Sequence, residues 1–413
     1  MIKRFGIGER YWRKNILSSS IRSATDSRLS VLHLPALLGY KLGCILVSLG
    51  ILVSASGGSW DITNHLLNKP ESFFSAPHGM LYAGVASAIL GSIIMSRQCK
   101  YPYGFSESFR KPTMLVITGI TMLIVAGPVD FAWHSAFGLD GLLSPPHFVL
   151  LTGMVISSLG SLIGLIVSKG SNDINDGSYI QHFNTLHNNK FSASLFFMRP
   201  PISMLLTIIG VIPIWLSLAG VIAMFSLPFS KTQYFDFNPD PSFGAVVATV
   251  GYPVLLSFIM ISSFRLGRNR FGVISLTALT YVAISAATVI IPNESLIQTL
   301  PFYFLNMVPI VAVDILLTLA KSRFRYSIYV IGGAILGSIF FMMQYPLITH
   351  VYNEVDTTGG FVWPSLTSQT YFGMMEQIYP LVAVPGATMG IIGSTVANIA
   401  ANKNLLALMT KGQ

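Results

Sequence analysis

Charged residues are scarce in this sequence. Asp, Glu, Lys and Arg make up 10% of its 413 residues, whereas hydrophobic residues make up 52%. Soluble domains carry about 25% charged residues, so this chain has too little polar surface to coat a globule of its size. The composition therefore excludes most soluble folds and predicts an all-α integral membrane protein.

Cysteine is also scarce, because Cys44 and Cys99 are the only two. They form no CxxC pair and no even-numbered framework, so we expect no structural disulfide. No GxGxxG, Walker or CxxCH motif occurs in a supporting context, so the sequence does not predict binding of nicotinamide, nucleotide or haem c. The net charge of +9 is typical of the cytoplasmic loops of membrane proteins, and we expect no nucleic-acid partner.

The chain has instead about ten apolar runs, each long enough to cross a bilayer. These runs lie near residues 42–59, 79–96, 113–133, 147–168, 201–226, 244–264, 273–292, 300–320, 326–344 and 380–400. The lipid bilayer is therefore the first expected partner, and a multi-pass protein of the cell membrane is predicted.

Basic residues alternate between successive loops. Of the 25 Lys and Arg residues, all but Lys69 and Lys231 fall on the side that also holds both termini. The positive-inside rule assigns that side to the cytoplasm. Ten of the 16 acidic residues fall on the opposite side, so a site formed by acidic residues is expected to face the extracytoplasmic side.

The runs and loops together predict four regions. These are a basic cytoplasmic arm over 1–41, a four-helix region over 42–170, a cytoplasmic loop over 171–200 and a six-helix membrane region over 201–413. The six later spans carry no pattern that indicates their role. The first four spans carry the most informative pattern in the chain.

That pattern is an internal repeat with an offset of 69 residues. WDITNHLLNKPESFFSAPHGMLYAG begins at Trp60, and VDFAWHSAFGLDGLLSPPHFVLLTG begins at Val129. Both segments follow the pattern D-x3-H-x5-(D or E)-x6-H. The offset matches Asp61 with Asp130, His65 with His134, Glu71 with Asp140 and His78 with His147. We interpret the two segments as a duplicated helical hairpin.

The spacing within each segment brings its side chains together. Asp61 and His65 are four residues apart, so a helix places both on one face. Pro77 suits the first turn of the next helix, and a tight return can bring His78 back against that face. We therefore expect one carboxylate and two imidazoles at the outer mouth of each hairpin.

One carboxylate with two imidazoles is a ligand set with open positions, which occurs with non-haem iron and also accepts zinc or copper. Imidazole suits copper well, but the ligand types alone do not distinguish copper from iron or zinc. The expected ligands are Asp61, His65, His78, Asp130, His134 and His147. Glu71 and Asp140 can orient a ligating imidazole or act as further ligands. A proton relay or a structural polar network is the alternative interpretation.

Residues 40–170 resemble the C subunit of the copper membrane monooxygenases, the family of particulate methane monooxygenase and ammonia monooxygenase. The resemblance rests on the two frames of Asp and His, on the SAPH and SPPH sequences before the returning spans, and on Trp133 before His134. In that family one triad of this spacing supplies a copper site, and a similarly spaced triad further downstream supplies another.

The resemblance implies copper at both frames and a role in oxidising a small apolar or weakly polar substrate with dioxygen. It also implies partner subunits in the membrane, and it assigns no catalytic residue beyond the ligands. Two features depart from the family. Its second triad begins with Asn where this chain has Asp130, and residues 201–400 have no counterpart in the C subunit.

Two other functions fit the same residues. One is metal-ion handling or transport, in which Asp314 within the eighth span would line a polar path. The other is a non-catalytic accessory subunit of the membrane. His350 and Glu354, four residues apart, can extend the metal site or form a lid above it, although an ordinary interfacial loop would have the same composition.

Overall fold

The computed structural model describes residues 36–64, 72–99, 107–138, 142–175, 202–226, 241–320, 324–339 and 373–402. Within these ranges the regular elements are all helices, and no strand occurs. The all-α prediction is therefore confirmed for this part of the chain. Helices suit these apolar segments because each backbone N–H and C=O group finds its partner within the same segment.

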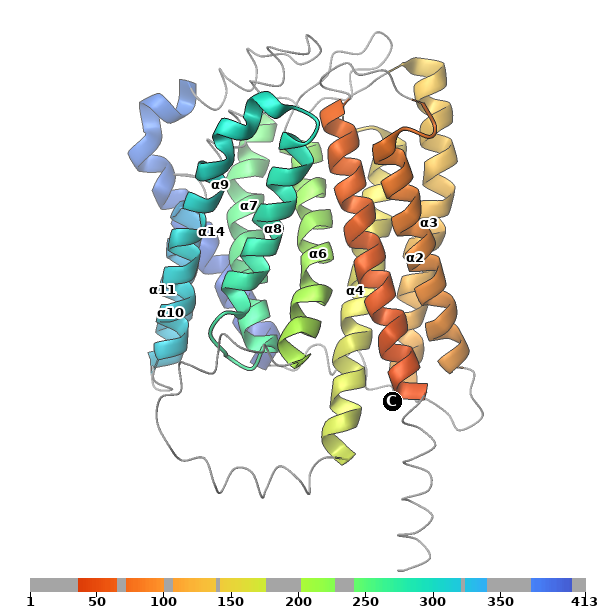
Figure 1. The fold of residues 1–413 in the computed structure, drawn as a ribbon. Coiled ribbons are helices and arrows are strands. Elements are labelled where there is room, and N and C mark those ends of the chain that lie inside the picture. Colours follow the sequence, from red (N-terminus) through yellow and green to blue (C-terminus); the bar gives the residue numbers. More distant parts are fainter. Residues whose placement is uncertain are drawn as a thin grey trace, which may run out of the picture.

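The first half contains four long helices. They are the first helix (Ala36–Asn64), α2 (Ala76–Cys99), α3 (Glu107–Phe137) and α4 (Pro145–Asn175). In Figure 1 they stand side by side, in red, orange and yellow, with α4 next to the second half of the molecule. Tyr40, Cys44, Val116 and Met154 belong to a common buried core of these four helices.

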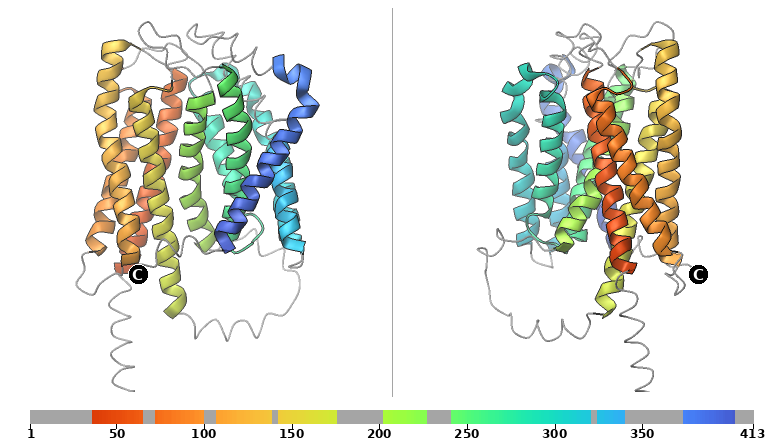
Figure 2. Two further views of the ribbon diagram at one scale, coloured as in Figure 1. Left: turned by 180° about the vertical axis from the view of Figure 1, so that it is seen from behind. Right: turned by 45° about the vertical axis from the view of Figure 1, so that its right-hand side comes forward.

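The second half contains longer and shorter helices around a core of its own. They are α6 (Ile202–Ser226), α7 (Pro241–Leu266), α8 (Val273–Ile290), η2 (Glu294–Thr299), α9 (Leu300–Leu305), α10 (Met307–Leu319), α11 (Arg325–Ile339) and α14 (Gly373–Asn402). Figure 2 shows α14 crossing obliquely over α7 and α11, the two helices against which it packs most extensively.

Nine helices of the described chain are long and apolar enough to cross a membrane. The protein is therefore a multi-pass membrane protein. These nine helices coincide with nine of the predicted spans. The remaining predicted span, 326–344, coincides with α11, whose 15 residues end at Ile339, and residues 340–344 lie outside the described ranges.

Two region boundaries differ from the predicted ones. The first helix begins at Ala36 and α4 continues to Asn175, so residues 36–41 and 171–175 belong to helices rather than to the arm and the loop. Both extensions are polar or weakly apolar ends of long helices, which a search for apolar runs does not detect. The rest of the arm and of the 171–200 loop lies outside the described residues.

The two hairpins of the first half cross at matching glycines. A Cβ atom built on Gly50 would lie 2.5 Å from the carbonyl oxygen of Gly84. A Cβ atom built on Gly119 would lie at the same distance, 2.5 Å, from that of Gly153. Each residue of the second pair stands 69 positions after its counterpart in the first. Both crossings therefore need glycine, because any side chain would separate the two backbones.

The two halves are joined next to the ends of these hairpins. Helix α4 packs against α6, and the Ser59 hydroxyl of the first helix donates a hydrogen bond to Thr288 Oγ1 of α8 at 3.1 Å. A buried cluster also joins Leu142, which precedes α4, to Met224 of α6 and Val282 of α8. The second half therefore supports the ends of the hairpins where the Asp and His residues lie.

An acidic side chain from α10 closes the turn between α7 and α8. Gly272, the N-cap of α8, has a φ of 88°, a left-handed conformation that glycine adopts without a steric penalty. The fully buried Asp314 carboxylate accepts hydrogen bonds from Gly272 N–H at 2.9 Å, Ser275 N–H at 3.0 Å and the Ser275 hydroxyl at 2.6 Å. Asp314 therefore caps the first turn of α8, where backbone amides lack partners within the helix.

Replacing Asp314 with alanine is expected to lower the free energy of unfolding by about 3 kcal/mol, because three buried donors lose their acceptor. Asp314→Asn keeps one acceptor oxygen and is expected to cost about 1 kcal/mol. The midpoint temperature of thermal unfolding in detergent, measured for both variants and the wild type, tests this role. Equal midpoints for the alanine variant and the wild type would contradict it.

Candidate metal centre

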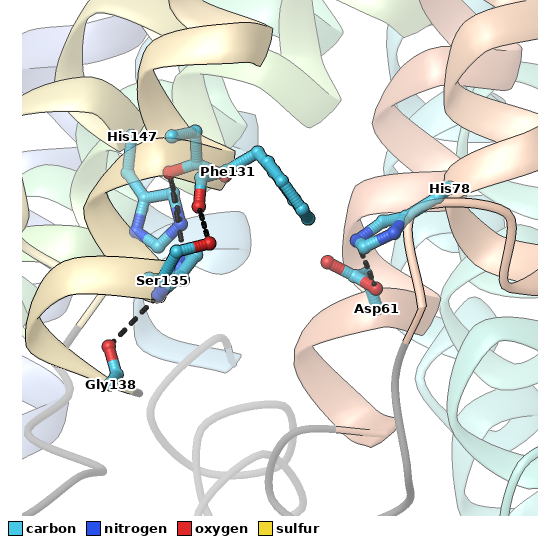
Figure 3. Close-up of polar contacts among 8 residues, drawn as sticks. Asp61, His78, Phe131, Ser135, Gly138 and His147 are labelled. Carbon is cyan, nitrogen blue, oxygen red and sulfur yellow. Dashed lines mark hydrogen bonds and ion pairs between the residues drawn. The ribbon is translucent and has the colours of Figure 1, made fainter.

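Asp130, His134 and His147 converge at one end of the hairpin formed by α3 and α4. Asp130 and His134 lie one turn apart near the end of α3, and His147 lies in the first turn of α4. Asp130 Oδ1 lies 3.6 Å from His134 Nε2 and 3.2 Å from His147 Nε2. The three ligand atoms lie within 4.8 Å of one another, so the second predicted triad is assembled (Figure 3).

A backbone carbonyl orients the His134 ring. Gly138, which follows α3 with a φ of 76°, places its carbonyl oxygen 3.2 Å from His134 Nδ1. A carbonyl oxygen only accepts hydrogen bonds, so Nδ1 must carry the proton, and a neutral ring then has its lone pair on Nε2, facing Asp130. Histidines that bind metals usually show this arrangement, with the other ring nitrogen donating to a carbonyl or carboxylate.

The distances around Asp130 match those between two ligands of one ion. Ligand atoms held about 2.0–2.1 Å from an ion lie roughly 2.9–3.4 Å apart at angles between 90° and 109°. The two Nε2–Oδ1 distances, 3.2 and 3.6 Å, lie within or just above this range. An acceptor nitrogen beside a carboxylate oxygen is stable only with positive charge between them, which either a metal ion or a second imidazole proton supplies. The donor set therefore fits a metal cation.

A matching pair occupies the end of the first hairpin. His78 Nε2 lies 3.1 Å from Asp61 Oδ1, and His78 Nδ1 lies 2.9 Å from the carbonyl oxygen of Ser72. By the same reasoning, the Ser72 carbonyl places the proton on Nδ1 and leaves the Nε2 lone pair facing Asp61. His65, the third member of this predicted triad, lies outside the described residues.

The local sequence explains why both histidines return to the aspartates. Helices α2 and α4 begin at Ala76 and Pro145, so prolines 77 and 146 lie in the first turn, where their missing N–H is not needed. The next residue in each helix is the histidine. The side chains of the pair and the triad are between 15% and 22% exposed, so they are mostly buried while part of each surface stays accessible.

Aromatic rings lie between the pair and the triad, and the sequence analysis did not identify them. The Phe73 ring centroid lies 5.1 Å from that of Tyr82 and 5.3 Å from that of Phe131. Phe131 directly follows Asp130, and Figure 3 shows its ring projecting towards Asp61 and His78. Tyr82 stands four residues after His78, with the two ring centroids 6.1 Å apart. That four-residue spacing is the one sequence signal from which Tyr82 could have been predicted.

The remaining predicted site residues are not part of this arrangement as described. Glu71, Asp140, His350 and Glu354 lie outside the described residues, so their roles stay predictions. Asp314 caps α8, and the neighbouring side chains of α10, Ile310 and Val313, are buried and apolar. These contacts do not support a polar path through Asp314, and the path also stays a prediction.

Comparisons of the chain with protein-family models, with curated proteins and with solved structures give no match. The assignment of a function therefore depends on the geometry of the Asp and His residues and on the membrane fold that holds them.

Proposed function

We propose that this protein is a membrane metalloprotein that binds an ion through Asp130, His134 and His147. One observation carries the proposal: the ligand atoms of these three residues lie within 4.8 Å of one another. The His134 ring is also oriented for binding, because its Nδ1 lies 3.2 Å from the Gly138 carbonyl oxygen. In a structural polar network, by contrast, each buried imidazole nitrogen would be expected to have its own hydrogen-bond partner. His147 Nδ1 is buried and makes no hydrogen bond to the described residues.

A second ion is proposed at Asp61, His65 and His78. Support comes from the matching Nε2–Oδ1 contacts of His78 and His147 and from the matching glycine crossings of the two hairpins. Both sets of contacts repeat with the offset of 69 residues that relates the sequence segments. We infer from them that the first four helices are a duplicated hairpin and that the duplication carried the ligands with it.

Copper is the proposed ion, with iron and zinc as alternatives. Imidazole nitrogen is a good ligand for all three, and divalent copper binds such sites most strongly among the first-row metals. A carboxylate with two imidazoles leaves open positions on any of them. With an open position, a reduced copper or iron ion can activate dioxygen, which is the chemistry that the resemblance to copper membrane monooxygenases implies.

Within that proposal, the substrate is a small apolar or weakly polar molecule that reaches the site from the bilayer. Val129, which directly precedes Asp130, is 48% exposed, and exposed apolar side chains on a membrane-spanning helix face lipid. The ion sites would lie towards the extracytoplasmic side, as the distribution of basic residues predicts. Other membrane subunits are proposed partners for electron supply.

Metal analysis of the purified protein, combined with electron paramagnetic resonance after copper loading, tests this function. We expect bound copper in the wild type with nitrogen hyperfine structure from imidazole. The double variant His134→Ala/His147→Ala should lose the copper of the second site, because only the carboxylate remains. His187→Ala is the matched control, since this histidine belongs to neither frame.

Equal copper content in the wild type and the double variant would overturn the ligand assignment. Bound iron or zinc instead of copper, lost in the same variant, would keep the site and change its ion. Oxygen consumption by the copper-loaded protein with small apolar substrates then tests the oxidative activity separately from binding.

A further inference from the structure

The three aromatic residues between the pair and the triad break the symmetry of the two hairpins. With the offset of 69 residues, Phe73 corresponds to Leu142, Tyr82 to Leu151, and Phe131 to Ile62. Each aromatic residue therefore has an aliphatic counterpart. Because this difference occurs at all three positions and the rings contact one another, the aromatic cluster is specific to the space between the two sites.

Packing explains the aliphatic residues but not the aromatic ones. Leu142 is 5% exposed in the cluster shared with α6 and α8, and Leu151 packs against the same cluster and near Gly220 of α6. Phe73 and Phe131, by contrast, are 39% and 48% exposed. Lipid contact alone needs no aromatic ring, since aliphatic side chains face lipid equally well.

Ring contacts connect Tyr82 to both hairpins, because the Phe73 ring contacts both Tyr82 and Phe131 of α3. Tyr82 makes ring contacts with His78 and Phe73 and no hydrogen bond to the described residues. A phenol without an acceptor of its own, next to the His78 ring, can donate a hydrogen bond to a ligand added beside that histidine.

We propose that Tyr82, next to the rings of His78 and Phe73, recognises a small hydrogen-bond-accepting ligand on the open position of an ion bound by these Asp and His residues. The ligand class is small oxygen- or nitrogen-donor molecules of the size of dioxygen or azide. Phe73 and Phe131 exclude water around the ligand, and the phenol donates one hydrogen bond to it. This inference rests on the proposed metal binding and deepens it, because it assigns a specificity-determining residue outside the ligand set.

Azide titration of the copper-loaded protein tests the inference, with azide binding followed by its charge-transfer absorption and by the change in the copper resonance signal. Tyr82→Phe keeps the ring and removes only the hydroxyl. We expect it to retain the wild-type copper content and to bind azide about tenfold more weakly, the effect of losing one hydrogen bond to a charged group. Tyr326→Phe, on the half-exposed start of α11, is the matched control and should bind azide as the wild type does.

Three outcomes separate this inference from the proposed function. Unchanged azide affinity in Tyr82→Phe, with full copper content, would overturn the inference alone and would leave Tyr82 as an interfacial anchor. Loss of copper from Tyr82→Phe would also overturn it, because a residue that recognises the added ligand is not needed to hold the ion. Absence of copper, iron and zinc from the wild type, even after metal loading, would overturn the proposed function together with the inference.

Discussion

Replacing Asp130 with alanine is expected to lower the copper affinity of the second site by more than about 100-fold, the loss that even supporting residues of metal sites can cause. Asp130 Oδ1 lies within 3.6 Å of the Nε2 atoms of both imidazoles. Without it, two neutral nitrogens on separate helices remain, with no negative charge to balance the ion. A competition titration against a copper chelator measures the change.

Two further variants make this result specific. Asp61→Ala removes the matching carboxylate of the first hairpin and should leave the affinity of the second site unchanged. Asp130→Asn introduces the residue that the resembling family carries at this position, and it should give an intermediate affinity because one oxygen ligand remains while the charge is lost. Wild-type affinity in Asp130→Ala would remove this residue from the ligand set.

The ten apolar runs predicted where the helices lie, because a bilayer demands long segments with internally paired backbones. They predicted the helix ends less well. Asp61 lies beyond the predicted run 42–59, and Asp130 lies close to the end of the run 113–133. Both helices continue past these residues, to Asn64 and Phe137. Helical hydrogen bonding continues through these polar turns, which hydropathy alone does not indicate.

For the site, the sequence predicted the residues and their approach but not their supports. The four-residue spacing and the repeat predicted that Asp130, His134 and His147 would meet, and this meeting is confirmed. The carbonyls of Gly138 and Ser72, which orient two of the imidazoles, were not predictable because main-chain acceptors depend on loop geometry. Every residue has a main-chain carbonyl, so no residue type indicates which one will act as the acceptor.

The capping role of Asp314 shows a similar limit. An ionisable residue inside a predicted span is by default a functional candidate, and the sequence cannot show that its partners are amides 39 to 42 positions away. The role of the second half is equally hard to predict from the sequence. Its described contacts with Leu142 and with the first helix support the ends of the hairpins, a role that depends on tertiary packing and leaves no motif.

Replacing Gly390 with leucine is expected to cause the largest loss of stability in the second half. A Cβ atom at Gly390 would clash with the carbonyl oxygen of Gly333 on α11, and one at Gly337 with that of Gly386 on α14. Helices in a bilayer associate through such close backbone contact, because lipid supplies no hydrophobic driving force between them. The obstacle is backbone and cannot rotate away, so we expect a loss of about 3 kcal/mol, the upper end of the usual cost of overpacking.

Gly127→Leu is the matched control, since a Cβ atom there meets nothing within 4 Å of the described structure. This substitution should leave stability unchanged or raise it by up to about 1 kcal/mol through better helix propensity. The midpoint temperature of unfolding in one detergent compares both variants with the wild type. A Gly390→Leu protein as stable as Gly127→Leu would mean that α11 and α14 do not depend on this glycine contact, whereas a selective loss would show that small residues hold α14 against α11.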